Sequence, residues 1–158
     1  GLDLSMITNG QSLSGLRAEL LGQAKWVRVS MDYTSSEQMV ASRNVPESWF
    51  DGVITNLEQF ATTKTQSCDL GVNFIITNYN YEGLVPFAKR IKDIGVENVR
   101  FSPVYVQNFK EYHAPIATRV REQLAYVGEA RAGERNPVAR EGAANVSKLQ
   151  IGAAAILA

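Results

Sequence analysis

Short β-branched, apolar segments alternate with longer segments of helical periodicity over residues 1 to 106, and this alternation limits the possible folds more than any other feature. Each helical segment is long enough to serve as a crossover, and strands joined by such crossovers pair in parallel. The sequence therefore predicts an α/β fold built on a parallel sheet, with the strands in sequential order because the crossovers are right-handed.

The period of the apolar residues separates the two kinds of segment. Strands repeat apolar residues every second position, and helices repeat them every three or four positions. The predicted strands are Leu2–Ile7, Lys25–Asp32, Leu70–Thr77 and Asn98–Val106. The regular part of the last strand is expected to end near Phe101 or Ser102, because Pro103 has no N–H group to donate. The predicted helices are Ser12–Ala24, Glu47–Thr62, Glu82–Ile94 and Pro115–Ala130.

Composition narrows the classes of function. The 158 residues suffice for one core, and 16 basic residues balance 16 acidic residues, which excludes the basic excess typical of nucleic-acid and anionic-membrane binding. The single cysteine, Cys68, cannot form an intrachain disulfide and fits a reducing compartment. No apolar run approaches the ~20 residues of a membrane span, and no secretory signal begins the chain. We therefore expect a soluble cytoplasmic protein with no nucleic-acid or membrane partner.

Polar side chains follow the predicted strands where each strand ends. Parallel α/β sheets bind ligands at the carboxyl ends of their strands. Ser30 and Asp32, with Arg28 on the same face of the strand, suit a ligand carboxylate or a ribose, but polar residues at strand ends also cap helices. The Thr8-Asn9-Gly10 segment by itself indicates only a turn. The residues expected to share this edge are Thr8, Ser30, Asp32, Thr77, Asn78 and Asn80.

Two other reactive side chains have no partners in the sequence pattern. His113 is the only histidine, and no second histidine or cysteine lies near it to complete a metal site, so we expect a surface or helix-entry residue. Cys68 lacks a Cys-x-x-Cys partner and is expected to be a small buried or half-exposed thiol, not a nucleophile. We predict no metal ligands in the chain.

Taken in order, the motifs resemble those of radical S-adenosylmethionine enzymes. The series runs from Ile7-Thr8-Asn9-Gly10 through Trp26–Asp32, Arg43-Asn44 and Gly71–Ile76, with Asn80 and Glu82, to Val99-Arg100-Phe101. The resemblance covers about residues 1 to 106. It implies strands three to six of the partial (β/α)6 barrel of that family, here residues 1–112. Apolar spacing predicts an amphipathic helix at 113–131, and the alanine- and glycine-rich composition predicts a low-order tail at 132–158.

The resemblance also implies which residues bind the cofactor, S-adenosylmethionine. Thr8 and Ser30 would contact its methionine moiety or ribose, and Arg43 would pair with its carboxylate. The strand ends around Asn73–Asn80 and Phe101–Val104 would offer backbone partners and an apolar wall to the adenine. Asp32 and Arg28 would alternatively face the substrate or stabilise the barrel interior. The predicted cofactor-binding set is Thr8, Ser30, Asp32, Arg43, Asn73 and Asn80.

One departure from the family is large. The Cys-x3-Cys-x2-Cys loop that holds its 4Fe-4S cluster and the Gly-Gly-Glu segment that takes the cofactor's amino group are both absent, and one cysteine cannot hold such a cluster. The resemblance therefore implies a C-terminal fragment, inactive alone, of an enzyme that cleaves S-adenosylmethionine reductively. Such an enzyme forms a 5′-deoxyadenosyl radical and abstracts hydrogen from a substrate that the sequence does not identify.

An alternative from another class of function stays open. A non-catalytic α/β half-barrel that binds a nucleotide or a protein partner would show the same alternation of strands and helices. A Cys-x3-Cys-x2-Cys loop encoded upstream of residue 1 would decide for the enzyme fragment. In either case, an unpaired edge strand at Leu4–Ile7 predicts self-association.

Overall fold

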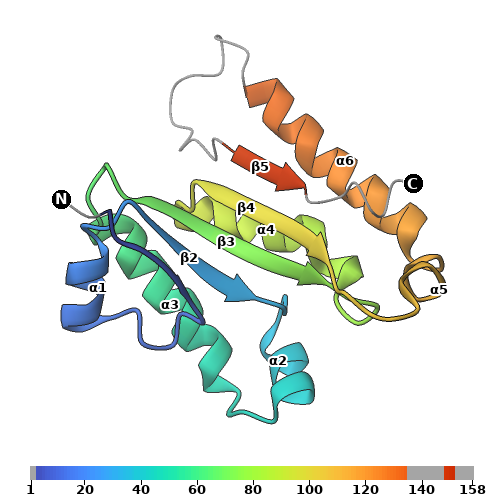
Figure 1. The fold of residues 1–158 in the computed structure, drawn as a ribbon, viewed down its shortest axis with the longest axis horizontal. Coiled ribbons are helices and arrows are strands. Elements are labelled where there is room, and N and C mark those ends of the chain that lie inside the picture. Colours follow the sequence, from blue (N-terminus) through green and yellow to red (C-terminus); the bar gives the residue numbers. More distant parts are fainter. Residues whose placement is uncertain (1–2, 135–147, 152–158) are drawn as a thin grey trace.

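A five-stranded parallel sheet with the strand order β1-β2-β3-β4-β5 forms the centre of the computed structural model, which describes residues 3–134 and 148–151 (Figure 1). All neighbouring strands pair in parallel. The α/β class and the sequential, parallel strand order predicted from the sequence are confirmed. The strands are β1 (Ser5–Thr8), β2 (Trp26–Met31), β3 (Asp69–Ile76), β4 (Asn98–Pro103) and β5 (Lys148–Ile151).

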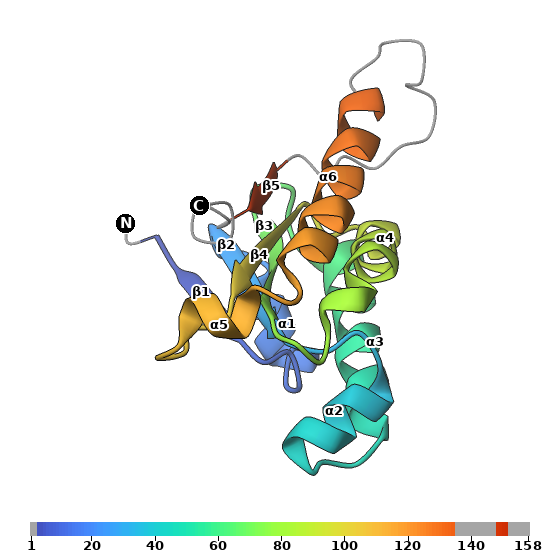
Figure 2. The ribbon, with the colours of Figure 1, turned by 90° about the vertical axis from the view of Figure 1, so that its right-hand side faces the viewer.

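Helices connect the strands, and the long helices α3, α4 and α6 lie on the same side of the sheet (Figure 2). Within residues 3–134 and 148–151, no helix combines the length and apolar character needed to cross a bilayer. The helices are α1 (Gly15–Leu21), α2 (Ser36–Arg43), α3 (Ser48–Thr63), the 3-10 turn η1 (Tyr81–Gly83), α4 (Leu84–Ile94), α5 (Phe109–His113) and α6 (Ala117–Glu134).

The two faces of the sheet differ in polarity because successive strand residues point to opposite sides. On the helix side, Phe74 of β3 packs against Phe87 of α4 and Phe101 of β4, with ring centroids 4.6 Å and 5.6 Å apart. Val27, Val29 and Met31 of β2 belong to the same buried core. The alternate positions form the opposite face, which we call the polar face and which carries Arg28, Ser30, Asn73, Arg100 and Ser102.

Helix α2 is not predicted by the apolar periodicity of the sequence. Ser35 caps its first turn by accepting a hydrogen bond from Gln38 N at 3.4 Å, and Asn44 ends it in the left-handed conformation with φ of 51°. The spacing of Ser35 and Gln38 is that of a capping box. Met39 is the only buried residue of α2, so the apolar periodicity that reveals longer helices is weak here.

Strand β5 lies within residues 132–158, for which the composition predicts a low-order tail. Its backbone pairs with β4, from Asn98 opposite Lys148 to Phe101 opposite Ile151. In these four residues apolar and polar side chains alternate, as in a strand with one face on the sheet. Residues 135–147 and 152–158 lie outside the described residues, so the expectation for them stays a prediction, as do the other domain boundaries.

Strand β1 occupies the other edge of the sheet and exposes apolar side chains. Leu4 and Ile7 are 51% and 57% exposed, and Leu16 and Leu20 of α1 are 69% and 58% exposed. No described strand pairs with the outer side of β1. An open edge of this kind is a template for pairing with another chain.

We expect the 158-residue chain to self-associate through this edge. Sedimentation velocity over a range of protein concentrations should show dimers or larger species, and Ile7→Lys should shift the distribution towards monomer, because charged side chains oppose edge pairing. Val40→Lys, at an exposed position of α2, is the matched control and should leave the association unchanged. A monomer at every concentration would contradict this expectation.

Candidate functional site

Two cavities lie at the edge of the sheet where β2 and β3 end. The first measures about 320 Å³ and lies between the end of β2, α2 and the start of α3. The second measures about 710 Å³ and lies between the ends of β2 and β3 and helix α2. Asp32, Tyr33 and Arg43 line both cavities and separate them. This is the edge where parallel α/β sheets place their ligands.

Arg43 is the central cation of this site. It lies in the last turn of α2, where the helix dipole favours a positive charge. Its Nη2 donates to Asp32 Oδ2 at 3.0 Å, and its Nε donates to Tyr33 Oη at 3.0 Å. The hydrogen bond to Tyr33 raises the pKa of the Arg43 guanidinium. The side chain is 56% exposed, and its Nη1 has no hydrogen bond to the described residues, so the guanidinium is oriented but still open to a ligand.

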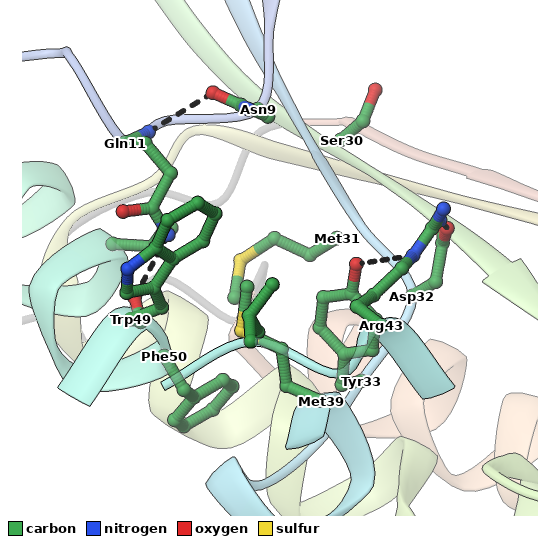
Figure 3. Close-up of a pocket in the computed structure, with 12 residues that line it drawn as sticks. Asn9, Gln11, Ser30, Met31, Asp32, Tyr33, Met39, Arg43, Trp49 and Phe50 are labelled. Atoms are coloured by element: carbon green, nitrogen blue, oxygen red, sulfur yellow. Dashed lines mark hydrogen bonds and ion pairs between the residues drawn. The ribbon is translucent and has the colours of Figure 1, made fainter. Parts of the chain in front are cut away.

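The first cavity combines an apolar floor with a polar rim, as Figure 3 shows. Met31, Met39 and Phe50 form part of the floor, and Ser30 lies on the rim with its hydroxyl pointing away from that floor. Ser30 is exposed and makes no hydrogen bond with its side chain among the described residues. Mostly apolar walls with a few convergent polar groups are typical of sites for small molecules.

The turn that follows β1 shapes one side of the first cavity. Thr8 Oγ1 accepts a hydrogen bond from Gly10 N at 3.2 Å, and Asn56 Nδ2 of α3 donates to Gly10 O at 2.9 Å. Gly10 has a φ of +80°, and a Cβ there would lie 2.9 Å from side-chain atoms of Val29 and Val53. Thr8 lines neither cavity, so the structure uses its hydroxyl to close the turn.

Asn80 joins the ends of β2 and β3. Its Oδ1 accepts from Thr77 N at 2.8 Å, and its Nδ2 donates to Asp32 O and to Ile75 O, both at 2.8 Å. The residue is 2% exposed, although it contributes to the wall of the second cavity. With both amide hydrogens donated inside the chain, Asn80 positions the backbone of the site.

The remaining residue of the predicted set, Asn73, lies farther from the cavities. It is opposite Ser30 on one side and Arg100 on the other, on the polar face. The structure thus brings Ser30, Asp32 and Arg43 together around the first cavity and Asn80 beside the second. It places Thr8 and Asn73 outside both.

Sequence reasoning missed Tyr33 and the contribution of α2 to this edge. Tyr33 orients Arg43 and lines both cavities, and Gln38 Oε1 accepts from Thr34 N at 2.9 Å. The capping-box spacing of Ser35 and Gln38 was the available signal for the helix that carries Arg43. Nothing in the pattern singled out Tyr33.

His113 is buried, which corrects the expectation of a surface position; it lies just before α6, where Ile116 N donates to its carbonyl oxygen. It is 3% exposed, its Nε2 lies 3.0 Å from Val104 O, and its ring packs against Phe109 and Tyr112 at centroid distances of 4.4 Å and 4.9 Å. The short helix α5 folds back onto the rim, where Tyr112 Oη donates to Asn78 Oδ1 at 2.6 Å. The polar residues around His113 in the sequence do not indicate that α5 folds back onto the rim and buries this ring.

Cys68 lies at the opposite end of the sheet, just before β3 begins. The thiol is 1% exposed, and burial raises its pKa, so it is a poor nucleophile at neutral pH. Among the described residues, no group of three or more histidine, cysteine or acidic side chains is arranged to hold a metal ion.

Comparison with known proteins identifies the fold. No protein-family profile and no curated protein matches the sequence. Three structures of SuiB from Streptococcus suis match 93% of the chain. The structure bound to S-adenosylmethionine has a TM-score of 0.63 at 14% identity, the one bound to the precursor peptide SuiA has 0.64 at 14%, and a third has 0.63 at 16%.

The chain spans only 31% to 32% of the length of these SuiB chains. SuiB is a radical S-adenosylmethionine enzyme. At this level of identity, the similarity identifies a shared fold. The chain has the fold of part of a radical S-adenosylmethionine enzyme core, a partial β/α barrel.

Proposed function

We propose that this chain binds S-adenosylmethionine at the carboxyl edge of its sheet and holds it in place for a radical S-adenosylmethionine enzyme. The observation that carries the proposal is the geometry of Arg43. Asp32 and Tyr33 hold the guanidinium at the junction of two cavities, with Nη1 left without a hydrogen bond among the described residues. A site of this form selects a small molecule that carries a carboxylate.

The groups around Arg43 match the other parts of S-adenosylmethionine. One oxygen of the Asp32 carboxylate pairs with Arg43, and the other can accept hydrogen bonds from the ribose hydroxyls. The nearby Ser30 hydroxyl can donate or accept a hydrogen bond to the same ligand. In the second cavity, Ile75 and Val104 offer apolar contacts to the adenine, and Tyr79, which is 83% exposed, offers a stacking surface. Both cavities have volumes within the range of ligand sites.

The 4Fe-4S cluster of the family does not fit the residues of this chain. Such clusters are held by several cysteine thiolates, whereas Cys68 is the only cysteine and is buried at the opposite end of the sheet. We therefore assign to this chain the binding and positioning of the cofactor, and we expect no activity from the chain alone. The single unpaired thiol also fits our proposal of a cytoplasmic location.

Isothermal titration of the 158-residue chain with S-adenosylmethionine, and separately with ATP and adenosine, tests the proposal. ATP and adenosine share the nucleoside but lack the amino-acid carboxylate that Arg43 is proposed to bind. We expect saturable binding of S-adenosylmethionine that is at least tenfold tighter than the binding of ATP or of adenosine. Equal binding of ATP would favour a nucleotide-binding module, and no saturable binding of S-adenosylmethionine would contradict the proposal.

Ser30→Ala should weaken the binding of S-adenosylmethionine by about 0.5–1.5 kcal/mol, the net contribution of one hydrogen bond, which corresponds to roughly two- to tenfold in Kd. The same titration measures the effect. Ser67→Ala is the matched control, because Ser67 is exposed and lies just before β3, at the opposite end of the sheet. An unchanged Kd for Ser30→Ala would remove this residue from the site.

A further inference from the structure

Arg28 and Arg100 lie on the polar face of the sheet, opposite the helix layer. Arg28 is on β2, Arg100 is on β4, and Asn73 of β3 lies between the two strands. Asn73 is directly opposite both Ser30 and Arg100, and Arg28 lies two residues before Ser30 on the same side of β2. The three neighbouring strands thus present two guanidinium groups and one amide on the same face.

The described part of the chain provides no carboxylate for either arginine. The ion pairs within the described residues join other side chains, and the acidic residues nearest to the two arginines along the sheet already have partners. Asp69, at the amino end of β3, accepts a hydrogen bond from Asn98 at 2.7 Å, and Asp32, beyond the end of β2, pairs with Arg43. Between Asp69 and Asp32, the polar face carries the positive charges of Arg28 and Arg100. No acidic residue in the described part of the chain neutralises them.

Arg28 is half-buried and held in place, unlike a solvated surface arginine. Its guanidinium carbon lies 5.2 Å from the centroid of the Trp26 ring, a cation–π distance that limits its freedom. Its Nε is buried without a hydrogen-bond partner among the described residues, and so is Asn73 Oδ1 on the adjacent strand. Buried polar atoms are nearly always hydrogen-bonded, and two exceptions on adjacent strands indicate an arrangement completed by another molecule.

The spacing of the strands allows both arginines to reach one ligand. Neighbouring strands lie ~4.8 Å apart and two residues span ~7 Å of a strand, so the backbones at Arg28 and Arg100 are separated by roughly 12 Å. Two arginine side chains can converge across this distance on a single anion, and the guanidinium fork matches carboxylate and phosphate oxygens. Arg28 lies two residues, or about 7 Å, before Ser30 along β2. An anion held between the two arginines would therefore lie beside Ser30 and the first cavity.

We propose that the polar face binds an anionic group of the substrate, a carboxylate or a phosphate, between Arg28 and Arg100, with Asn73 as a hydrogen-bonding neighbour. The inference rests on the proposed function, because it places the substrate next to the bound S-adenosylmethionine. It goes further by naming the charge of the group that the substrate must carry. A neutral substrate would leave both guanidinium groups without a counter-charge.

The test uses glutarate and inorganic phosphate as separate probes, at constant ionic strength so that general screening does not change. The Nε–Hε resonances of Arg28 and Arg100 are followed by NMR during each titration of the 158-residue chain. We expect saturable shifts of both resonances with at least one probe, and the stronger probe identifies carboxylate or phosphate as the preferred chemistry. Glutaramide, the neutral analogue of glutarate, should cause no shift.

Variants separate this site from the general charge of the protein. Arg28→Gln and Arg100→Gln should each weaken binding of the preferred probe at least fivefold, and Arg28→Lys should weaken it less than Arg28→Gln. Arg121→Gln is the matched control, because Arg121 is exposed on α6. Amide spectra verify that each variant folds, and if Arg28→Gln does not fold, Arg100→Gln carries the test.

Separate titrations with S-adenosylmethionine make the two proposals distinguishable. If the cofactor binds but neither anion shifts the arginine resonances, the anion site is wrong and the proposed function stands. If an anion binds at both arginines but the cofactor does not bind, the proposed function fails and the face is an anion site of another kind. If Arg121→Gln weakened the binding of the preferred probe as much as Arg100→Gln does, the proposed anion site would be wrong.

Discussion

Replacing Asn80 with alanine is expected to lower the free energy of unfolding by about 2–4 kcal/mol. The substitution removes the three hydrogen bonds of the buried Asn80 side chain, with Thr77 N, Asp32 O and Ile75 O, each with a net contribution of about 0.5–1.5 kcal/mol. It also leaves the backbone groups of two strand ends without partners. Urea denaturation followed by circular dichroism measures the change.

Two further variants test this explanation. Asn80→Asp keeps the acceptor for Thr77 N but loses both donors and places a carboxylate against two carbonyl oxygens, so it should destabilise the protein at least as much. Asn78→Ala is the matched control: Asn78 is exposed, and its side chain accepts a single hydrogen bond from Tyr112. If Asn80→Ala were no more destabilising than Asn78→Ala, Asn80 would not be the structural link between β2 and β3.

Replacing Arg43 with alanine is expected to weaken the binding of S-adenosylmethionine by about 1.5–3 kcal/mol, the range for hydrogen bonds to charged groups, or roughly 10- to 150-fold in Kd. A deeply buried charge pair would give a larger loss, but the Arg43 side chain is 56% exposed, so water screens the interaction. Isothermal titration measures the Kd.

The same variant should change stability little, because an exposed ion pair such as Arg43–Asp32 contributes only about 0–1 kcal/mol. Arg43→Lys keeps the charge but not the planar fork, and it should recover part of the affinity. Arg17→Ala, on the exposed side of α1, is the matched control and should have no effect on binding. An unaltered Kd for Arg43→Ala would contradict the assignment of the carboxylate to this residue.

The strands of the sheet were predictable because their residues have two distinct environments. In β2, Val27, Val29 and Met31 are buried, while Arg28 and Ser30 lie on the polar face, and this division appears in the sequence as a period of two. Helix α3 was predictable for a similar reason, since its buried residues Phe50, Val53, Ile54, Leu57 and Phe60 recur at helical spacing. Such patterns reflect burial directly.

Elements with little burial were not predictable in this way. Helix α2 buries only Met39, and β5 has only four residues, so neither produces a strong apolar period. Such segments are too short for the apolar period to repeat often enough to be recognised. Their positions depend on the neighbours they pair with, which the local sequence does not reveal.

The roles of polar residues were the least predictable. Ser30, Asp32 and Arg43 lie around one cavity at this edge; strand direction places Ser30 and Asp32 there, and the family resemblance places Arg43 with them. Asn80 was expected to contact the cofactor, but the structure directs its amide to the backbone. Whether an amide faces a ligand or its own chain depends on distances of a few ångströms, which residue type and spacing do not specify.

NMR titration of the 158-residue chain with S-adenosylmethionine tests the central claim, cofactor binding at the carboxyl edge of the sheet, most directly. We predict shifts of the amide resonances of Ser30 and Asp32 and of the Arg43 Nε–Hε resonance, with Cys68 at the opposite end unaffected. Adenosine, which has no carboxylate, should leave the Arg43 resonance unshifted. Saturable shifts around Cys68 with none at Ser30, Asp32 and Arg43 would contradict the account.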